Sequence, residues 1–245
     1  MNILKQIISA KKEGKKQIAV LVDPDKLNTD ELLNLVSKIK ASPINYILVG
    51  GSLLSSDQMD EYIGLIKQNI DIPVVIFPGS VHQISNKADG ILFLSLISGR
   101  NPEFLIGSQV VAAPLLKRSK LEILSTGYVL VDSGIQTTAS YISNTTPLPR
   151  DKADIAVATA LASEMIGHKL LYLDGGSGAK LEVPSEMISA VKKYIDIPLI
   201  VGGGINSKEK LETAFNSGAD LVVIGTAIEK NQDFLNEVVE VLSSN

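Results

Sequence analysis

The chain has 245 residues, a formal net charge of −4 and no cysteine. Its interspersed charges lack the basic surface of a nucleic-acid-binding protein, and the absence of cysteine excludes disulfides, thiolate catalysis and thiolate metal sites. The N-terminal segment does not follow the pattern of a secretory leader, and no apolar run approaches the length that spans a bilayer. The sequence therefore predicts a cytoplasmic protein without a transmembrane segment.

Short apolar segments alternate with amphipathic ones, which is typical of βα units that build a parallel sheet. Eight apolar segments predict strands over 18–23, 46–51, 73–79, 90–97, 127–132, 169–176, 198–204 and 221–228. Helical spacing and capping residues predict helices over 28–40, 55–69, 184–194, 207–218 and 231–242, with another helix closing over 161–167. The length suits one (β/α)8 barrel of about 250 residues, although two small domains would also fit.

Two connections depart from this regular pattern. Between Gly79 and Gly90 too few residues remain for the usual helical crossover, so the third connection is predicted to be a short irregular segment. The connection from Ser133 to Arg150 is long and polar, and loops of that length are usually functional or mobile.

Four short motifs recur in the same order in the two halves of the chain, at offsets between 109 and 131 residues. The copies pair 20–23 with 129–132, 50–52 with 175–177, 70–73 with 195–198, and 88–89 with 219–220. Four matches in register indicate two related halves of four strands each. They favour one TIM-barrel domain over residues 1–245 rather than two domains.

Glycine-rich turns follow the last three predicted strands. The sixth strand runs into residues 174–178, the seventh ends in residues 202–204, and the eighth ends in Gly225 and Thr226. Barrel active sites lie at the carboxyl ends of the strands, often with a phosphate site after strands seven and eight. Glycine lets backbone N–H groups approach an anion, and a short helix near residue 227 would add its positive end. The three turns favour phosphate binding over the alternative that each glycine only closes a tight turn.

Oxygen-bearing side chains follow the first two strands. Asp23 and Ser52 are hard ligands suited to Mg2+ bound together with substrate phosphate oxygens. From the residues alone the simpler interpretation is favoured, in which Asp23 shapes a turn around Pro24 and Ser52 caps a helix. Asp174 lies beside the predicted phosphate site, where it could act as a general base on a bound alcohol or only orient a hydroxyl.

These motifs together resemble the family of geranylgeranylglyceryl phosphate synthases and bacterial heptaprenylglyceryl phosphate synthases. The resemblance covers nearly the whole chain and is carried by VDPDK at 22–26, VGGS at 49–52, YLDGGSG at 172–178, VGGGI at 201–205 and VIGTAIE at 223–229. It implies a TIM barrel whose third helix is replaced by a short irregular segment. It also implies a transferase that joins sn-glycerol 1-phosphate to a polyprenyl diphosphate, with geranylgeranyl diphosphate as the expected donor.

The resemblance further implies roles for particular residues. It places Mg2+ at Asp23 and Ser52 and makes Asp174 the catalytic base, although the family commonly has the longer Glu at this position. The implied glycerol-phosphate positions are Tyr172, Leu173, Asp174, Gly175, Gly176, Ser177, Gly178, Gly203, Gly204, Gly225 and Thr226. Members of the family form homo-oligomers, so a dimer or hexamer is expected.

Two other interpretations remain open at this point. A phosphosugar isomerase or lyase of the same barrel type would need an acid–base pair, which Asp23 and Asp132 could supply. A non-catalytic phosphometabolite-binding module would bind phosphate without turnover. The synthase interpretation is favoured, because only it explains Asp23, Ser52 and the 172–178 segment together.

Overall fold

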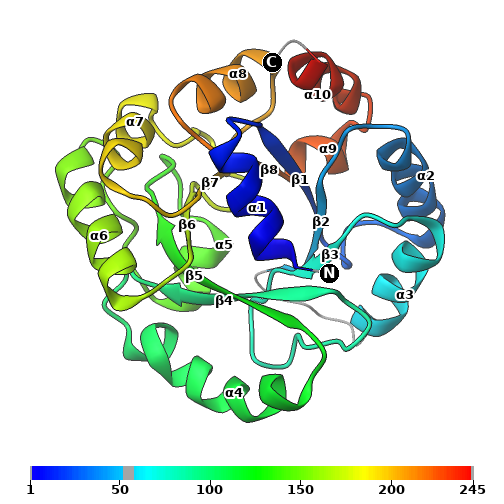
Figure 1. Cartoon of the computed structure of the whole chain (residues 1–245), viewed down its shortest axis with the longest axis horizontal. Helices are drawn as coiled ribbons and strands as arrows, with labels where there is room; N and C mark the ends of the chain where they lie inside the picture. Colours follow the sequence, from blue (N-terminus) through cyan, green and yellow to red (C-terminus); the bar gives the residue numbers. More distant parts are fainter. Residues whose placement is uncertain (1, 52–57, 244–245) are drawn as a thin grey trace.

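Eight parallel strands close into a barrel in chain order in the computed structural model, which describes residues 2–51 and 58–243 (Figure 1). The strands are β1 Gln17–Val22, β2 Tyr46–Val49, β3 Val74–Ile76, β4 Gly90–Leu96, β5 Glu122–Leu130, β6 Leu170–Asp174, β7 Leu199–Gly202 and β8 Leu221–Ile224. Pairing of β1 with β8 closes the barrel, with Gln17 opposite Leu221. The predicted eight-stranded TIM barrel is thereby confirmed.

Alternate residues of a strand face two different cores, as β1 shows. Ile18, Val20 and Val22 belong to the core between the strands and the helices, whereas Ala19 belongs to the smaller core inside the barrel. Most predicted strands extend too far at their carboxyl ends, because the glycine-rich segments leave the hydrogen-bonded ladder and form the barrel mouth. The predicted fifth strand, over 127–132, also starts too late: β5 begins at Glu122, in a segment whose polar residues hide the strand pattern.

Helices surround the barrel on its outer side (Figure 1). After the N-terminal helix come α2 Thr29–Lys40, α3 Met59–Asn69, α4 Ser108–Arg118, α5 Thr138–Ser143, α6 Ala153–Ile166, α7 Ser185–Tyr194, α8 Lys208–Asn216, α9 Thr226–Lys230 and α10 Phe234–Ser243. Of these, the short helices α5 and α9 lie at the carboxyl ends of the strands rather than on the outer side (Figure 1). A π-helical turn, η1 Glu103–Gly107, precedes α4. Asn28 and Glu31 form a capping box that starts α2.

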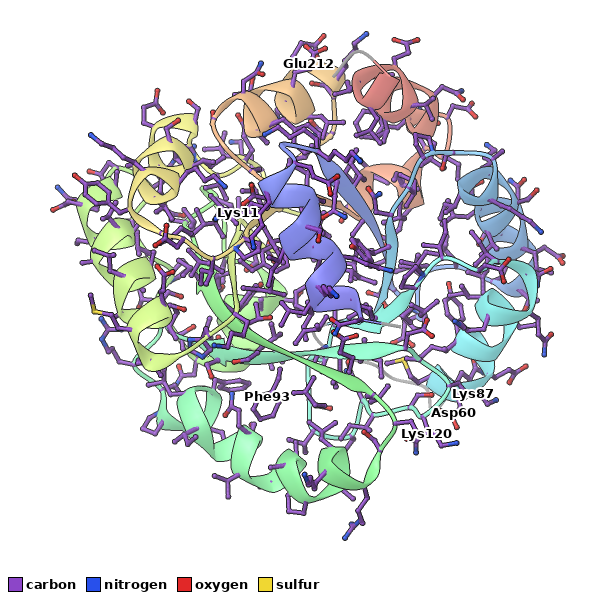
Figure 2. All side chains as sticks on the ribbon, in the orientation of Figure 1. Lys11, Asp60, Lys87, Phe93, Lys120 and Glu212 are labelled. Carbon is purple, nitrogen blue, oxygen red and sulfur yellow. The ribbon has the colours of Figure 1, made fainter. Side chains whose placement is uncertain are left out.

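The third connection lacks a helix, as predicted. Residues 77–89, all of which are described, run from β3 to β4 as turns and irregular backbone. Phe93 of β4 therefore lies between the barrel wall and α4 without a covering third helix (Figure 2). The polar connection over 133–150, predicted as a loop, contains α5, which Thr137 and Ser140 start with a capping box.

The N-terminal helix α1, Ile3–Lys12, was not predicted. It crosses the end of the barrel that lies away from the strand carboxyl ends, and Ile3 and Ile7 are buried (Figure 1). The Glu122 carboxylate accepts hydrogen bonds from the backbone N–H groups of Ile3 and Leu4, which attaches the first turn of α1 to the start of β5. The helix thus closes the barrel floor and leaves the other end as the entrance.

Charged side chains point outward around the helical shell, as Asp60 and Lys87 do (Figure 2). Within the described parts of the chain, no helix combines the length and apolar character needed to cross a membrane.

Candidate functional site

A cavity of about 410 Å³ opens at the carboxyl ends of the strands. All eight strands, or the turns that follow them, contribute to its wall. The cavity continues over β3 and β4 to α4, where Ile91, Phe93, Ala112 and Leu116 line it beside the third connection, which lacks a helix. The cavity therefore has a polar mouth and an apolar side compartment.

The predicted phosphate-binding turns meet at one edge of this cavity. Ser177, Gly203, Gly204 and Gly225 all line it, and α9 begins directly at Thr226. Gly203 has a positive φ of 80°, and a Cβ there would lie 2.7 Å from the Asp174 carboxylate. Only glycine permits this approach of two backbone segments, so the turns are built for close packing around the edge of the cavity.

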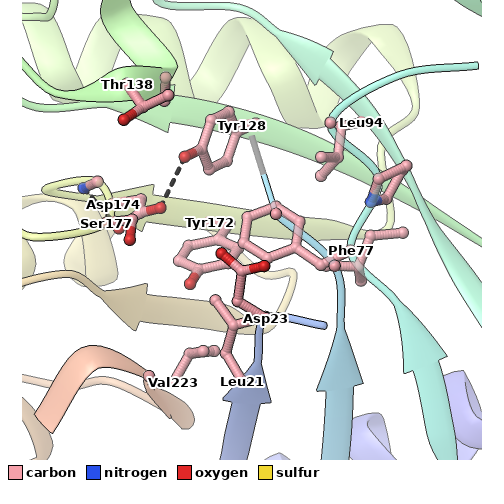
Figure 3. Close-up of a pocket in the computed structure, with 18 of the residues that line it drawn as sticks. Leu21, Asp23, Phe77, Leu94, Tyr128, Thr138, Tyr172, Asp174, Ser177 and Val223 are labelled. Atoms are coloured by element: carbon pink, nitrogen blue, oxygen red, sulfur yellow. Dashed lines mark hydrogen bonds between the residues drawn. The ribbon is translucent and has the colours of Figure 1, made fainter. Parts of the chain in front are cut away.

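Asp174 ends β6 beneath this edge and is nearly inaccessible, with 5% of its surface exposed. The Tyr128 hydroxyl donates a hydrogen bond to Oδ2 at 2.6 Å, and the Gly176 N–H donates one to Oδ1 at 2.8 Å (Figure 3). Burial raises the pKa of Asp174 above its ordinary value, and the two hydrogen bonds lower it part of the way back. A carboxylate with a raised pKa, placed in a cavity, is suited to accept a proton from a bound hydroxyl.

Three aromatic rings pack together on one side of this carboxylate. Phe77, Tyr128 and Tyr172 pack with ring centroids 5.5–5.9 Å apart (Figure 3). Burial raises the pKa of both tyrosines well above the ordinary value, so both remain neutral phenols at physiological pH. The rings exclude water and leave the Tyr128 hydroxyl as a fixed donor to Asp174.

The other edge of the cavity carries Asp23, directly after β1. Its carboxylate is 16% exposed, and the Lys26 ammonium lies 3.4 Å from its Oδ2 and 3.1 Å from the Glu229 Oε2. Burial lowers the pKa of Lys26, but the attraction of Glu229 and Asp23 outweighs it and leaves the pKa raised. The Glu229 side chain, only 7% exposed, also accepts a hydrogen bond from the Asp23 N–H at 3.3 Å.

The carboxylate oxygens at this edge are of the ligand type that Mg2+ prefers. The described residues contain no group of three or more His, Cys, Asp or Glu side chains placed to hold a metal ion. Mg2+ is commonly bound through only one or two carboxylates, with water and substrate phosphate oxygens completing its shell. Asp23 can supply such a carboxylate, with that of Glu229 nearby. Ser52, the other predicted ligand, lies outside the described residues.

The structure brings most of the predicted site residues together. Those that line the cavity are Asp23, Tyr172, Asp174, Gly176, Ser177, Gly178, Gly203, Gly204, Gly225 and Thr226. Two others lie behind the wall: the Leu173 side chain is fully buried between the strands and the helices, and the Gly175 N–H donates to the Gly202 carbonyl. Asp132, which the isomerase interpretation required, is not among the residues that line the cavity and instead accepts a hydrogen bond from the Gly134 N–H.

Three polar residues of the site were missed by the sequence analysis. Tyr128 was included only as part of a predicted strand, and Lys26 and Glu229 only as members of the segments VDPDK and VIGTAIE. The signal that could have found Tyr128 is its inward position on a strand next to the one that ends in Asp174. For Lys26 and Glu229, the closure of β1 against β8 brings the two segments together.

Comparisons with known proteins identify the family of the chain. A sequence profile of the PcrB family matches residues 10–242. The geranylgeranylglyceryl phosphate synthase of Flavobacterium johnsoniae is 53% identical, with 96% of each chain covered, and that of Chitinophaga pinensis is 49% identical, with 97% of this chain and 94% of the relative covered.

Among solved structures, (S)-3-O-geranylgeranylglyceryl phosphate synthase from Thermoplasma acidophilum, in complex with its substrate sn-glycerol-1-phosphate, has a TM-score of 0.94. It is 34% identical in sequence, with 100% of both chains covered. A thiamine phosphate pyrophosphorylase from Pyrococcus furiosus, at 15% identity, TM-score 0.61 and coverage of 95% of this chain and 98% of that one, shares the barrel fold alone. On the match of the profile and of these full-length relatives, the chain belongs to the PcrB family.

Proposed function

We propose that the chain is a Mg2+-dependent prenyltransferase that joins sn-glycerol 1-phosphate to a polyprenyl diphosphate, with geranylgeranyl diphosphate as the expected donor. The observation that carries this proposal is the buried Asp174 carboxylate, held by the Tyr128 hydroxyl at 2.6 Å beside the glycine-rich edge. The names of the relatives and the substrate bound in the Thermoplasma acidophilum enzyme support it.

The glycine-rich edge would bind the phosphate of the acceptor. Backbone N–H groups in glycine turns bind anions, and here they belong to Gly203, Gly204 and the turn after Asp174. This anchoring would place the terminal free hydroxyl of the acceptor near the Asp174 carboxylate. Such positioning removes much of the entropic barrier to reaction between two bound molecules.

In the proposed reaction the hydroxyl oxygen forms a bond to C1 of the prenyl group as the bond from C1 to the diphosphate oxygen breaks. The hydroxyl proton passes to the Asp174 carboxylate, whose raised pKa favours its acceptance. Asp23, together with Ser52 or Glu229, would hold Mg2+, which supplies positive charge to the departing diphosphate. The neutral aromatic rings beside Asp174 keep water away from the reacting carbon.

The apolar side compartment would receive the prenyl chain. Phe93, Ala112 and Leu116 line the part of the cavity that reaches between β4 and α4. A phosphorylated acceptor has no use for such a wall, whereas a long hydrocarbon tail is stabilised by contact with it.

We also propose a homo-oligomer, a dimer or a hexamer, located in the cytoplasm. Apolar side chains are exposed on the outer face of α6, where Ile155, Met165 and Ile166 expose 44%, 81% and 75% of their surfaces. A second copy of the chain would cover them, which light scattering coupled to gel filtration would test.

One assay tests the proposed reaction. The protein is incubated with Mg2+, labelled sn-glycerol 1-phosphate and prenyl diphosphates of several lengths, and lipid products are extracted into organic solvent. We expect an organic-soluble label with at least one donor, little label with sn-glycerol 3-phosphate, and loss of product when EDTA removes the metal. No product with any donor would overturn the proposal. Acceptor binding without turnover would point to a binding module, and turnover of a phosphosugar without Mg2+ would point to an isomerase.

A further inference from the structure

Lys26 lies between the two edges of the cavity. Its ammonium nitrogen is 3.1 Å from Glu229 Oε2 and 3.4 Å from Asp23 Oδ2, on the side of the proposed metal site. The same nitrogen is 3.4 Å from the Ser177 hydroxyl oxygen, on the side of the proposed phosphate site. One cation therefore contacts side chains from both binding regions.

The carboxylates of Asp23 and Glu229 require a counter-ion when no ligand is bound. Glu229 is 93% buried as a side chain, being 7% exposed, and a buried carboxylate without a counter-ion is strongly destabilising. Among the described residues that line the cavity, Lys26 and Lys230 are the basic ones, and Lys26 is the one paired with Asp23 and Glu229. In the ligand-free chain Lys26 is thus the counter-ion of both carboxylates.

A divalent cation bound through Asp23 would take over that role. Two positive groups within a few ångströms of each other repel, so the ammonium and the metal ion compete for the same oxygens. The Lys26 side chain is 41% exposed and flexible, and Ser177 marks a second position within its present reach. There an ammonium would contact an anion held by the glycine turns.

We propose that Lys26 is an exchangeable counter-ion that couples metal binding to acceptor binding. Without Mg2+ it neutralises Asp23 and Glu229, and when Mg2+ binds it turns to the phosphate of the acceptor beside Ser177. This inference rests on the proposed function, because it takes the two edges as the metal and phosphate sites. It adds to that function that acceptor binding depends on metal binding, and that Lys26 couples the two sites.

Coupling of this kind is reciprocal. If Mg2+ frees Lys26 to bind the acceptor, then the acceptor must raise the affinity for Mg2+ by the same factor. Couplings between sites commonly amount to about 5- to 150-fold in affinity. We therefore expect Mg2+ to tighten the binding of sn-glycerol 1-phosphate at least about fivefold.

Isothermal titration calorimetry without any prenyl donor measures this coupling apart from turnover. Wild-type protein is titrated with sn-glycerol 1-phosphate in the presence of Mg2+ or of EDTA, and with Mg2+ in the absence of the acceptor. In Lys26→Met the ratio of the two acceptor affinities should fall to about one, and the free protein should bind Mg2+ more tightly because its competitor is gone. Lys26→Arg keeps the charge and should keep a ratio above one.

Two further variants control for charge and for folding. Lys230→Met removes a cation that lines the same cavity, and the coupling ratio should stay at the wild-type value. Glu229→Gln releases Lys26 from its main partner while Lys26 itself is intact. Its affinity for the acceptor in EDTA should rise, and its ratio should shrink. This variant tests the exchange even if Lys26→Met does not fold.

The outcomes separate this inference from the proposed function. A ratio near one in the wild type, or a wild-type ratio in Lys26→Met, would overturn the exchange while prenyl transfer by the wild type stands. An unchanged acceptor affinity in EDTA for Glu229→Gln would overturn it as well. Failure of the wild type to bind sn-glycerol 1-phosphate under either condition would overturn the proposed function and the exchange together.

Discussion

Replacing Asp174 by asparagine should strongly lower turnover and stabilise the fold. The exchange keeps the shape of a side chain that is 5% exposed and removes its charge. Both hydrogen bonds can be kept: the amide oxygen accepts from the Gly176 N–H, and the amide NH2 donates to the Tyr128 oxygen, which now acts as the acceptor. Asp174→Asn therefore tests the charge and its basicity with little disturbance of the packing.

The two effects have different physical origins and sizes. Loss of a general base commonly lowers the rate about 100- to 10,000-fold, and here it should lower kcat while leaving the affinity for the acceptor nearly unchanged. The fold gains because burial raises the pKa of Asp174, so the charged form is disfavoured in the folded state. Single stabilising substitutions commonly contribute about 0.5–2 kcal/mol, and we expect a gain within this range. Since about 1 kcal/mol moves the Tm of a chain of this size by about 2–4 °C, a rise of a few degrees is expected.

The pH dependence of this gain distinguishes charge from packing. Because the folded-state pKa is raised, the folded chain holds its proton at pH values where the unfolded chain has lost it, and stability falls as the pH rises through that range. The advantage of Asp174→Asn should be complete above the raised pKa and should shrink as the pH falls toward the ordinary value of 3.8. Thermal denaturation followed by circular dichroism at several pH values measures it. A lower Tm than the wild type at neutral pH, or substantial remaining transferase activity, would refute the reasoning.

Three more substitutions test the walls of the site. Tyr128→Phe removes a hydrogen bond that lowers the pKa of Asp174, so the acidic limb of the pH profile of kcat/KM should move to higher pH. At pH values below that limb, kcat/KM should fall about 10- to 100-fold. An unchanged pH profile would contradict this role of Tyr128. Gly203→Ala places a Cβ 2.7 Å from Asp174 Oδ1 at a φ of 80°. The substitution should lower the free energy of unfolding by about 1–3 kcal/mol, measured by chemical denaturation, and should weaken acceptor binding, measured by calorimetry. Stability equal to that of the wild type would argue against this close approach. Ala112→Trp should shorten the preferred prenyl donor in the product assay, whereas Val110→Trp, on the exposed face of the same helix, should not; equal product lengths would place the tail elsewhere.

The repeat found in the sequence has a physical counterpart in the two halves of the barrel. Asp89 accepts hydrogen bonds from Lys67 at 2.7 Å and from the N–H that begins β3 at 2.8 Å. Asp220 does the same with Lys192 at 2.6 Å and with the N–H that begins β7 at 2.8 Å. Each aspartate thus connects a helix to the strand that comes after that helix in the chain. The two halves therefore have the same lysine and the same aspartate at corresponding positions. The architecture could be predicted because each half repeats this local requirement.

The contacts that define the site depend on the register of the closed barrel, which local sequence patterns do not predict. Tyr128 reaches Asp174 because β5 and β6 pair with Leu130 opposite Asp174. Lys26 and Glu229 are 203 residues apart and meet because the last strand closes against the first. Helical spacing or glycine content predicts an element or a turn, but neither specifies which side chains from different strands come within hydrogen-bonding distance.

The distribution of polarity along the cavity argues for a two-part ligand on grounds independent of the relatives. Its charged lining comes from Asp174 of β6, from Glu229 and Lys230 of α9, and from the turn after β1, whereas β3, β4 and α4 contribute a wall dominated by apolar side chains such as Phe93 and Leu116. A phosphosugar is polar along its whole length, so it would leave the apolar compartment without a partner and would gain nothing from the missing third helix. A prenyl diphosphate matches both compartments, and only in one orientation, with its diphosphate at the charged end. That orientation places C1, the junction of the two parts, at the boundary between the compartments. The aromatic rings beside Asp174 line the same cavity and would lie at this boundary, so the sorting of polarity would bring the proposed base and the electrophilic carbon together.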